Sequence, residues 1–352
     1  MSKIYVDGYF FELLDYNKNI CINQISNYCQ FNKTNWISSL PDDCDIVALS
    51  FYTNDYSQHD KVIDQILPKT KKLIVNFSEP TDQSILNYIK NKKNDKLKIF
   101  SDIVVNTNNQ LSYKTNISWF MGPTNYYSKN DNLNSYLQSS WADEILSKLK
   151  PFNHDLQRKK MFDCLLGSKR HHRDFVERLY NNSAIKDKIF YTYYKDDLTK
   201  GVWTDNVDPN SREYNTLINN IEVSRFVILP YNIYNESYYS IIAETTAFNS
   251  YSQFTEKIAK PILAKRPFIV FCGQHYLRNL RSLGFQTFGE IIDESYDAEA
   301  DNSKRWSMAW DQIVHLSKMD PCVVYSHVNK ILEYNHKHFI DNDWRHEIKK
   351  EF

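Results

Sequence analysis

The sequence predicts an α/β fold made of two successive domains, and three observations support this. The chain has 352 residues, which corresponds to two domains at about 150 residues per domain. Short apolar runs alternate with longer polar stretches that are compatible with helices, which is the rhythm of β-α-β units. The rhythm begins again after a polar stretch that ends at Pro151, so we expect a domain boundary near residue 150.

The first half, residues 1–150, contains the first set of expected elements. Apolar runs predict strands at 3–6, 45–51, 72–77 and 98–103, and a further strand around Trp119 and Phe120. The stretch 60–67 is expected to be helical, because its apolar residues recur on one helical face: Val62, Ile63, Ile66 and Leu67. This half is therefore predicted to be one Rossmann-like domain.

The second half repeats the pattern over residues 151–322. Strands are expected at 161–166, 188–194, 225–229, 240–244 and 267–271, and helices at 171–181, 211–221, 255–264 and 275–283. Residues 323–352 predict one or two terminal helices that pack back on the first domain. Ligands of open α/β sheets bind outside the carboxyl ends of the strands, so residues directly after strands are the candidates for function.

Glycine content restricts how a phosphate group could be bound. The chain has only 7 glycines, and no two of them are separated by a single residue. Both the G-x-G-x-x-G fingerprint and the P-loop pattern are therefore absent. Any bound phosphate must be held by cationic side chains and helix N-termini.

Charge, hydropathy and cysteine usage exclude further classes. The formal net charge is zero, which argues against a general nucleic-acid or anionic-membrane surface. No apolar run approaches the length of a membrane-spanning helix, and the first residues do not resemble a signal peptide. The six cysteines are scattered, which is typical of reduced thiols in a cytoplasmic protein.

The most informative segment runs from residue 241 to residue 271. Glu244 follows an expected strand, and Thr255 is well placed as the N-cap of a helix whose first turn holds Glu256 and Lys257. A lysine in the first helical turn is unfavourable unless an anion binds there. Pro261 lies inside the same helix, and such departures from local rules cluster at functional sites. The alternative is a capped surface helix with a solvated Lys257.

This segment resembles a known family. Phe254-Thr255-Glu256-Lys257, followed by Pro261, is similar to the T-E-K segment of the α-1,3-fucosyltransferases and of related viral and phage glycosyltransferases. Glu244 stands twelve residues before Glu256, as the family's donor-site glutamate does. The resemblance covers roughly 30 residues. It implies a GT-B fold, with two Rossmann-like domains facing across a cleft, and an inverting transfer from a GDP- or UDP-sugar. It also implies a cytoplasmic protein, in the host cytoplasm if the source is viral.

A second segment, residues 165–173, agrees with this resemblance. In the family, a basic turn after a strand supplies an arginine to the donor diphosphate, and Arg173 matches that position best, with Arg170 next. An arginine fork can meet two phosphate oxygens at once; the alternative is a solvated helix start. The pair His171-His172 has no third ligand at a recognisable spacing, so we expect neither a metal nor another cofactor besides the nucleotide-sugar.

A third segment, residues 73–80, supplies a candidate general base. Glu79 follows an expected strand and stands between Ser78 and Pro80, whereas the family has its glutamate beside Ser-Pro. The resemblance implies that Glu79 takes the proton of an acceptor hydroxyl as that oxygen attacks the anomeric carbon. A turn or helix start is the alternative. Tyr231 and Tyr234 are candidates for stacking on the base or sugar of the donor.

Three other functions stay open. Glu236 and Glu244 have the E-x7-E spacing of retaining GT-B enzymes, although the stretch between them lacks the usual glycine. A phage-type enzyme that glycosylates modified DNA bases would bind nucleic acid only as its acceptor; otherwise the acceptor is a glycan or another hydroxyl. A non-catalytic nucleotide-sugar-binding protein with a degenerate GT-B fold is the third.

Overall fold

A computed structural model describes most of both halves of the chain. The residues described are 3–7, 22–26, 35–51, 56–77, 84–92, 94–101, 103–106, 114–115, 147–153, 157–195, 215–218, 221–224, 229–342, 344 and 350–352. The strand expected around Trp119 and Phe120, and most of the strand expected at 225–229, lie outside these residues.

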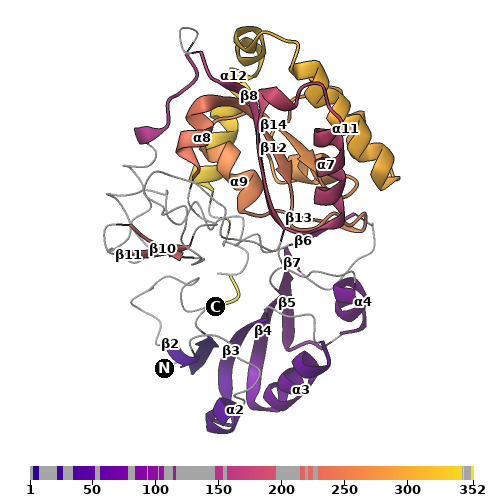
Figure 1. Cartoon of the computed structure of the whole chain (residues 1–352). Coiled ribbons are helices and arrows are strands. Elements are labelled where there is room, and N and C mark those ends of the chain that lie inside the picture. The colour runs from indigo at the N-terminus through magenta and orange to yellow at the C-terminus, as the bar shows by residue number, and fades with distance from the viewer. Residues whose placement is uncertain are drawn as a thin grey trace.

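The first part of the chain forms a six-stranded sheet in which all neighbours are parallel (Figure 1). Its strands lie in the order β2 (Ile22–Ser26), β1 (Ile4–Asp7), β3 (Cys44–Phe51), β4 (Thr70–Phe77), β5 (Leu97–Ser101) and β7 (Lys114–Thr115). β3 and the second half of β4 are mostly apolar and almost wholly buried, as expected for parallel strands with both faces covered. The strands predicted at 3–6, 45–51 and 72–77 are confirmed with slightly different bounds.

Three helices accompany this sheet: α2 (Asn35–Ser39), α3 (Tyr56–Ile66) and α4 (Ser84–Asn91), with a 3₁₀ turn η1 (Leu67–Lys69) after α3. Helix α3 buries Val62, Ile63 and Ile66, so the predicted apolar face is confirmed, although the helix begins at Tyr56. The strand predicted at 98–103 is in fact two strands, β5 and the short β6 (Ile103–Val105). They are separate strands because β6 pairs with a strand outside the first sheet.

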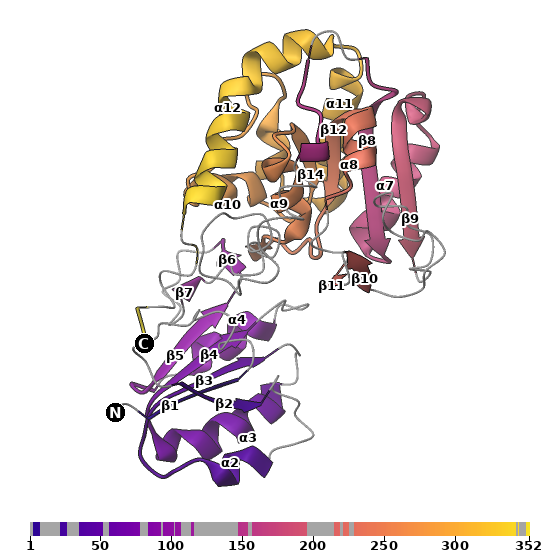
Figure 2. The same ribbon diagram turned by 90° about the vertical axis from the view of Figure 1, so that its left-hand side faces the viewer.

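The second part of the chain forms a four-stranded parallel sheet (Figure 2). Its order is β14 (Phe268–Phe271), β12 (Ser237–Ala243), β8 (Lys160–Ser168) and β9 (Ile189–Lys195). In chain order the strands run outward from β8 to β9 on one side and to β12 and β14 on the other. The direction of winding therefore reverses between β8 and β12, which makes the crevice between these two strands the topological switch point.

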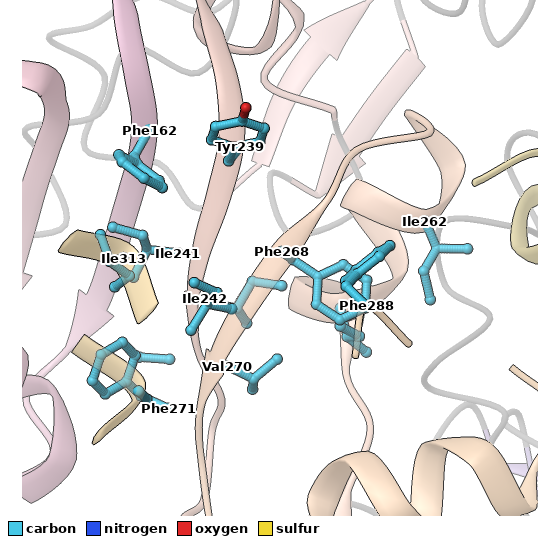
Figure 3. Close-up of a cluster of buried hydrophobic side chains, with 14 of the residues drawn as sticks. Phe162, Tyr239, Ile241, Ile242, Ile262, Phe268, Val270, Phe271, Phe288 and Ile313 are labelled. Atoms are coloured by element: carbon cyan, nitrogen blue, oxygen red, sulfur yellow. The ribbon is translucent and has the colours of Figure 1, made fainter. Parts of the chain in front are cut away.

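Helices cover both faces of the second sheet. Two helices pack against β14, namely α7 (His171–Asn181) and α11 (Asn302–Leu316). Two others pack on β12: α8 (Tyr231–Glu236) and α9 (Glu256–Leu263). The long helix α12 (Pro321–Asp341) covers α9. Short elements complete this part: η3 (Lys186–Lys188), α10 (Tyr276–Ser282) and η4 (Glu294–Ala298). The core side chains of β12 and β14, among them Ile241, Ile242, Val270 and Phe271, interleave with Phe288 and Ile313 (Figure 3). The α/β class predicted from the sequence is confirmed.

One predicted helix is wrong. Residues 211–221 were expected to be helical, but the described residues of this stretch form two antiparallel strands, β10 (Asn215–Ile218) and β11 (Ile221–Ser224). Their β-branched residues favour strands, and the close spacing of the two runs suits a hairpin. The sequence interpretation also missed α11.

The two parts of the chain have separate buried cores that meet at a short strand pair. Strand β6 pairs antiparallel with β13 (Tyr251–Gln253), which lies between β12 and α9. Within the described residues, the C-terminal segment reaches the first sheet at Lys72 of β4, whose Nζ donates to the Glu351 carbonyl oxygen at 2.7 Å and lies 3.3 Å from its carboxylate. Helix α12 itself packs on α9 of the second part, not on the first domain as expected for this segment. Within the described residues, the helices are too short or too polar to cross a membrane.

Candidate functional site

The candidate site lies at the carboxyl ends of β8 and β12, on the switch point of the second sheet. β8 ends at Ser168, and α7 begins three residues later at His171. β12 ends at Ala243, so Glu244 is the first residue beyond that strand. The segments 165–173 and 241–257, which are far apart in the sequence, therefore meet at the edge where ligands of α/β sheets bind.

Arg173 ties the two strand ends together. From the first turn of α7, its guanidinium donates to the carbonyl oxygens of Ser168 at 2.8 Å and Glu244 at 2.9 Å, and more weakly to that of Ala243 at 3.3 Å. The side chain is only 3% exposed. Both terminal nitrogens are thus engaged by the backbone, and among the described residues only its Nε has no hydrogen-bond partner. Arg173 holds the crevice together rather than facing outward as a fork.

His172 is the second α7 side chain in this contact. Its Nε2 lies 2.7 Å from the carbonyl oxygen of Glu244. Burial, with a smaller effect of the adjacent Arg173 charge, lowers the pKa of His172 to about 3, so the ring is neutral at physiological pH. Within the described part of the chain, no group of three or more histidine, cysteine, aspartate and glutamate side chains is arranged to hold a metal ion.

Glu244 is wholly buried, and its carboxylate is surrounded by donors. Tyr276 of α10 donates its hydroxyl hydrogen at 2.6 Å, and the Thr255 hydroxyl donates at 2.5 Å. The backbone amides of Thr245 and Thr255 approach the same carboxylate at 3.2 and 3.4 Å. Burial raises the pKa of Glu244, while the charge of Lys257 and these hydrogen bonds act against that shift. Glu244 therefore connects the start of its own loop at Thr245 with the cap residue Thr255 and with Tyr276 of α10.

The start of α9 has the cap that the sequence predicts. Thr255 has an extended backbone, and its hydroxyl oxygen accepts from the amide of Lys257. Glu256 and Lys257 form the first turn, and Pro261 lies inside the helix. Proline has no N–H to bond the carbonyl of Lys257, so the helical ladder is interrupted one turn after the cap. The predicted cap, first turn and internal proline are confirmed as local structure.

Lys257 is the most accessible cation of α9, with a quarter of its side chain exposed. Its Nζ lies 2.6 Å from a carboxylate oxygen of Glu256 and 3.1 Å from the Thr245 hydroxyl. Burial opposes ionisation of Glu256, but the charges of Lys257 and Lys260 outweigh it and lower the pKa of Glu256. The lysine is therefore held in an ion pair at the mouth of the site.

Lys260 is a site residue that the sequence interpretation missed. It lies one turn after Glu256 and is 4% exposed, and burial lowers the pKa of Lys260 to about 7. A cavity of about 70 Å³ lies between α9 and the sheet, and the side chains of Glu256, Lys257 and Lys260 line it together with Leu165, Gly167, Tyr234 and Ile242. This volume is enough for several waters or a small polar group. A lysine inside the otherwise apolar run Ile258–Leu263 was the signal that could have identified it.

Arg170 is an exposed cation on the α7 side of the crevice, next to the exposed Lys169. It is the N-cap residue of α7, yet its side chain makes no capping hydrogen bond, and its guanidinium donates only to the neighbouring carbonyl of Lys169 among the contacts described. The other long helices of this half, α9, α11 and α12, are capped by Thr255, Asp301 and Asp320. The start of α7 thus presents amide donors and positive charge without an internal cap.

Several expected residues lie elsewhere. Glu79 falls outside the described residues. Tyr231 and Tyr234 are buried in α8 before β12, and cations lie over their rings: Lys148 over Tyr231 at 5.4 Å and Arg266 over Tyr234 at 4.2 Å. Tyr234 borders the small cavity, whereas Tyr231 does not line it.

The glutamate pair of the retaining alternative is split by strand β12. Glu236 ends α8 at the amino end of β12, and Glu244 follows its carboxyl end. An extended strand rises about 3.3 Å per residue, so the two backbones are roughly 25 Å apart. Glu236 instead pairs with Lys159 at 2.6 Å. The two carboxylates therefore lie too far apart to serve one sugar.

Comparison with known proteins adds no assignment: the chain matches no protein-family model and none of the curated proteins.

Proposed function

We propose that this protein is a glycosyltransferase of the GT-B type that moves a sugar from a nucleoside-diphosphate sugar to an acceptor hydroxyl with inversion, as the fucosyltransferases do. One observation carries the proposal. The segments that resemble that family, 165–173 and 241–257, are distant in the chain but meet at the switch point of a parallel sheet. That point is where nucleotides bind in α/β folds. The resemblance to viral and phage enzymes makes the host cytoplasm part of the same proposal.

The diphosphate of the donor is proposed to lie against the start of α7. That helix start has no side-chain cap and carries the exposed Arg170, while Lys257 reaches the same edge from α9. Backbone amides at a helix N-terminus and nearby cations together bind anions without a glycine loop. In this arrangement Arg173 keeps the strand ends in register, and Glu244 fixes the loops that carry Thr255 and Lys257.

The transfer itself is proposed to be a direct displacement. The acceptor oxygen attacks the anomeric carbon, its proton passes to the Glu79 carboxylate, and the bond from that carbon to the diphosphate oxygen breaks. The negative charge that grows on the diphosphate is stabilised by Arg170 and Lys257. In the sequence, Glu79 stands two residues after the end of β4, and it is proposed as the acceptor-side base on the resemblance alone.

A second candidate, a nucleotide-sugar-binding protein without transfer activity, is favoured by one observation. Both terminal nitrogens of Arg173 and both carboxylate oxygens of Glu244 are engaged by protein groups, and Lys257 is held by Glu256. Groups that are already satisfied gain less from a ligand than free ones do. Transfer and donor hydrolysis therefore need to be measured beside binding.

The test is a thermal-shift screen of GDP, UDP, CMP, dTDP and their sugars, followed by transfer and hydrolysis assays with the best binder. A ligand of the native state raises the apparent stability by RT ln(1 + [L]/Kd). Lys257→Ala should lose most of the shift and the turnover, and Glu79→Gln should keep the shift and lose the transfer.

Lys265→Ala is the matched control, because Lys265 also pairs with a glutamate at 2.6 Å, here Glu333 of α12, away from the crevice. Lys265→Ala should leave binding unchanged. Saturable binding without transfer or hydrolysis would support the second candidate. If none of the nucleotides shifts the melting temperature, or if Lys257→Ala binds as well as the wild type, the proposed donor site is wrong.

A further inference from the structure

A side chain from the first half of the chain enters the loops that carry the candidate site. Asn106 directly follows β6, and its side-chain NH₂ donates to the carbonyl oxygens of Asn249 and Gln274, both at 2.8 Å. Its side-chain oxygen accepts from the Asn279 amide and, at 3.2 Å, from the Arg278 guanidinium. A side-chain amide has two donors and two acceptor positions, so all four are used. The backbone amide of Asn106 adds a fifth bond, to the carbonyl oxygen of Ser250 at 2.9 Å.

Each loop that Asn106 holds leads directly to a residue of the site. Asn249 and Ser250 belong to the loop that starts at Glu244 and continues through β13 to Thr255, the cap of α9. Gln274 stands two residues before Tyr276, whose hydroxyl donates to Glu244. The two loops are also joined to each other, because the Gln274 amide donates to the Asn249 side chain at 3.0 Å. Asn106 thus bonds to the two loops that lead to Thr255 and Tyr276, whose hydroxyl groups donate to the Glu244 carboxylate.

Strand β6 links this contact to the first sheet. Only one residue separates β6 from β5, and Ile103 is fully buried in the first core. Tyr251 of β13 is buried in that same first core, while Val104 of β6 packs against the second core. Each core thus accepts a side chain from the other part of the chain, so the first sheet is packed against the loop between Glu244 and Thr255.

We propose that Asn106 is a positioning residue for the donor site: through its side-chain hydrogen bonds, the first sheet sets the geometry of the loops that hold Glu244 and the start of α9. The inference rests on the proposed function. Under this proposal, a residue of the first half of the chain holds the loops of the donor-binding second half in place.

The test uses the full-length chain with Asn106→Asp. Aspartate has the same shape, but its carboxylate cannot donate to the carbonyl oxygens of Asn249 and Gln274 and repels them. Hydrogen exchange of the amides at 245–257 and 273–278 should rise by roughly tenfold or more, the effect expected from losing two net hydrogen bonds of local stability. Exchange in β8 and β12 should stay unchanged. Asn329→Asp, on the exposed side of α12, is the matched control and should change neither region.

A binding readout separates positioning from general support of the fold. If the loops are ordered in about one tenth of the molecules, the apparent KM for the donor rises about tenfold, while kcat of the bound complex is nearly unchanged. The probe is the nucleoside diphosphate that gives the largest shift in the wild-type screen, with its sugar for KM and kcat. Should Asn106→Asp not fold, Asn106→Ser is measured in the same way.

Either of two exchange results would overturn the inference: unchanged exchange at 245–257 in the variant, or a uniform rise of exchange through both sheets. A tenfold fall in kcat without a rise in KM would also contradict the inference. If the wild type binds no nucleoside diphosphate at all, the proposed function fails, and the exchange result alone decides whether Asn106 positions these loops.

Discussion

Removal of one hydroxyl group tests whether the donors around Glu244 stabilise the site. Tyr276 is 1% exposed, and its hydroxyl donates to the Glu244 carboxylate at 2.6 Å. Tyr276→Phe keeps the ring and its contact with Phe254, whose centroid lies 4.8 Å away, so it creates almost no cavity. A buried hydrogen bond to a charged group contributes about 1.5–3 kcal/mol. We expect the free energy of unfolding to fall by that amount.

The chain offers a matched control in Tyr239. This tyrosine is also 1% exposed, but among the residues that the structure describes its hydroxyl has no hydrogen-bond partner. Removal of a buried polar group without a partner is neutral or stabilising, because its desolvation cost disappears with it. Tyr239→Phe should therefore leave the free energy of unfolding unchanged or raise it slightly.

Urea unfolding at neutral pH, followed by circular dichroism, measures both variants. Tyr276→Phe should lower the midpoint with the same m-value as the wild type. The melting temperature should fall by roughly 3–12 °C, at about 2–4 °C per kcal/mol for a cooperative unit of this size. Equal losses in the two variants, or no loss in Tyr276→Phe, would refute the idea that the hydroxyl stabilises a buried carboxylate.

Three further changes probe the same region. Thr255→Val removes both the cap of α9 and a donor to Glu244, so it should cost about 1–3 kcal/mol in urea unfolding, whereas Thr255→Ser keeps the oxygen and should cost less. Burial raises the pKa of the Glu244 carboxyl above 4.5, so the folded state binds the carboxyl proton more tightly than the unfolded chain does. The stability that this group contributes is therefore full below pH 4.5 and is lost as the pH rises through the folded pKa. Glu244→Gln removes that loss, and its stability relative to the wild type should rise from acidic to neutral pH; a constant difference would contradict the buried ionisation. Gly273→Ala would place its Cβ 1.8 Å from the carbonyl oxygen of Phe248, so it should cost about 1–3 kcal/mol or more and displace the loop after Glu244, while Gly167→Ala meets its nearest side-chain atom at 3.6 Å and should be tolerated. Equal melting temperatures for the two glycine variants would show that the loop yields freely.

Local features of the site could be predicted because they depend on few residues. The bounds of α7 agree with the predicted 171–181, and Thr255 caps α9 as expected, because both follow from capping chemistry and apolar periodicity within one helix. The hairpin of β10 and β11 was predicted as a helix, because a short apolar run has no periodicity that distinguishes the two. Propensity decides such segments only weakly.

The roles of the charged residues could not be predicted, because they depend on contacts between distant segments. Arg173 was expected to face a diphosphate, yet its partners are carbonyl oxygens at the end of a strand about 70 residues away. Lys260 is the charged residue in the apolar run Ile258–Leu263, but its burial depends on α9 packing on the sheet, where Lys260 lines the small cavity. Burial of this kind is a tertiary effect that the helix sequence alone does not contain.

These contacts change how the shortage of glycine is understood. A glycine loop lets the backbone approach phosphate closely, and in the proposed donor site that geometry would have to come from side chains that are held in place. The buried carboxylate of Glu244 fixes the loop beside Thr255, and the partly exposed carboxylate of Glu256 holds Lys257 in place. Around them stand more cations than carboxylates, with Arg170 and Lys257 nearest to solvent. A surplus of fixed positive charge at a switch point favours a ligand with several negative charges, and a diphosphate meets that requirement better than a neutral sugar does.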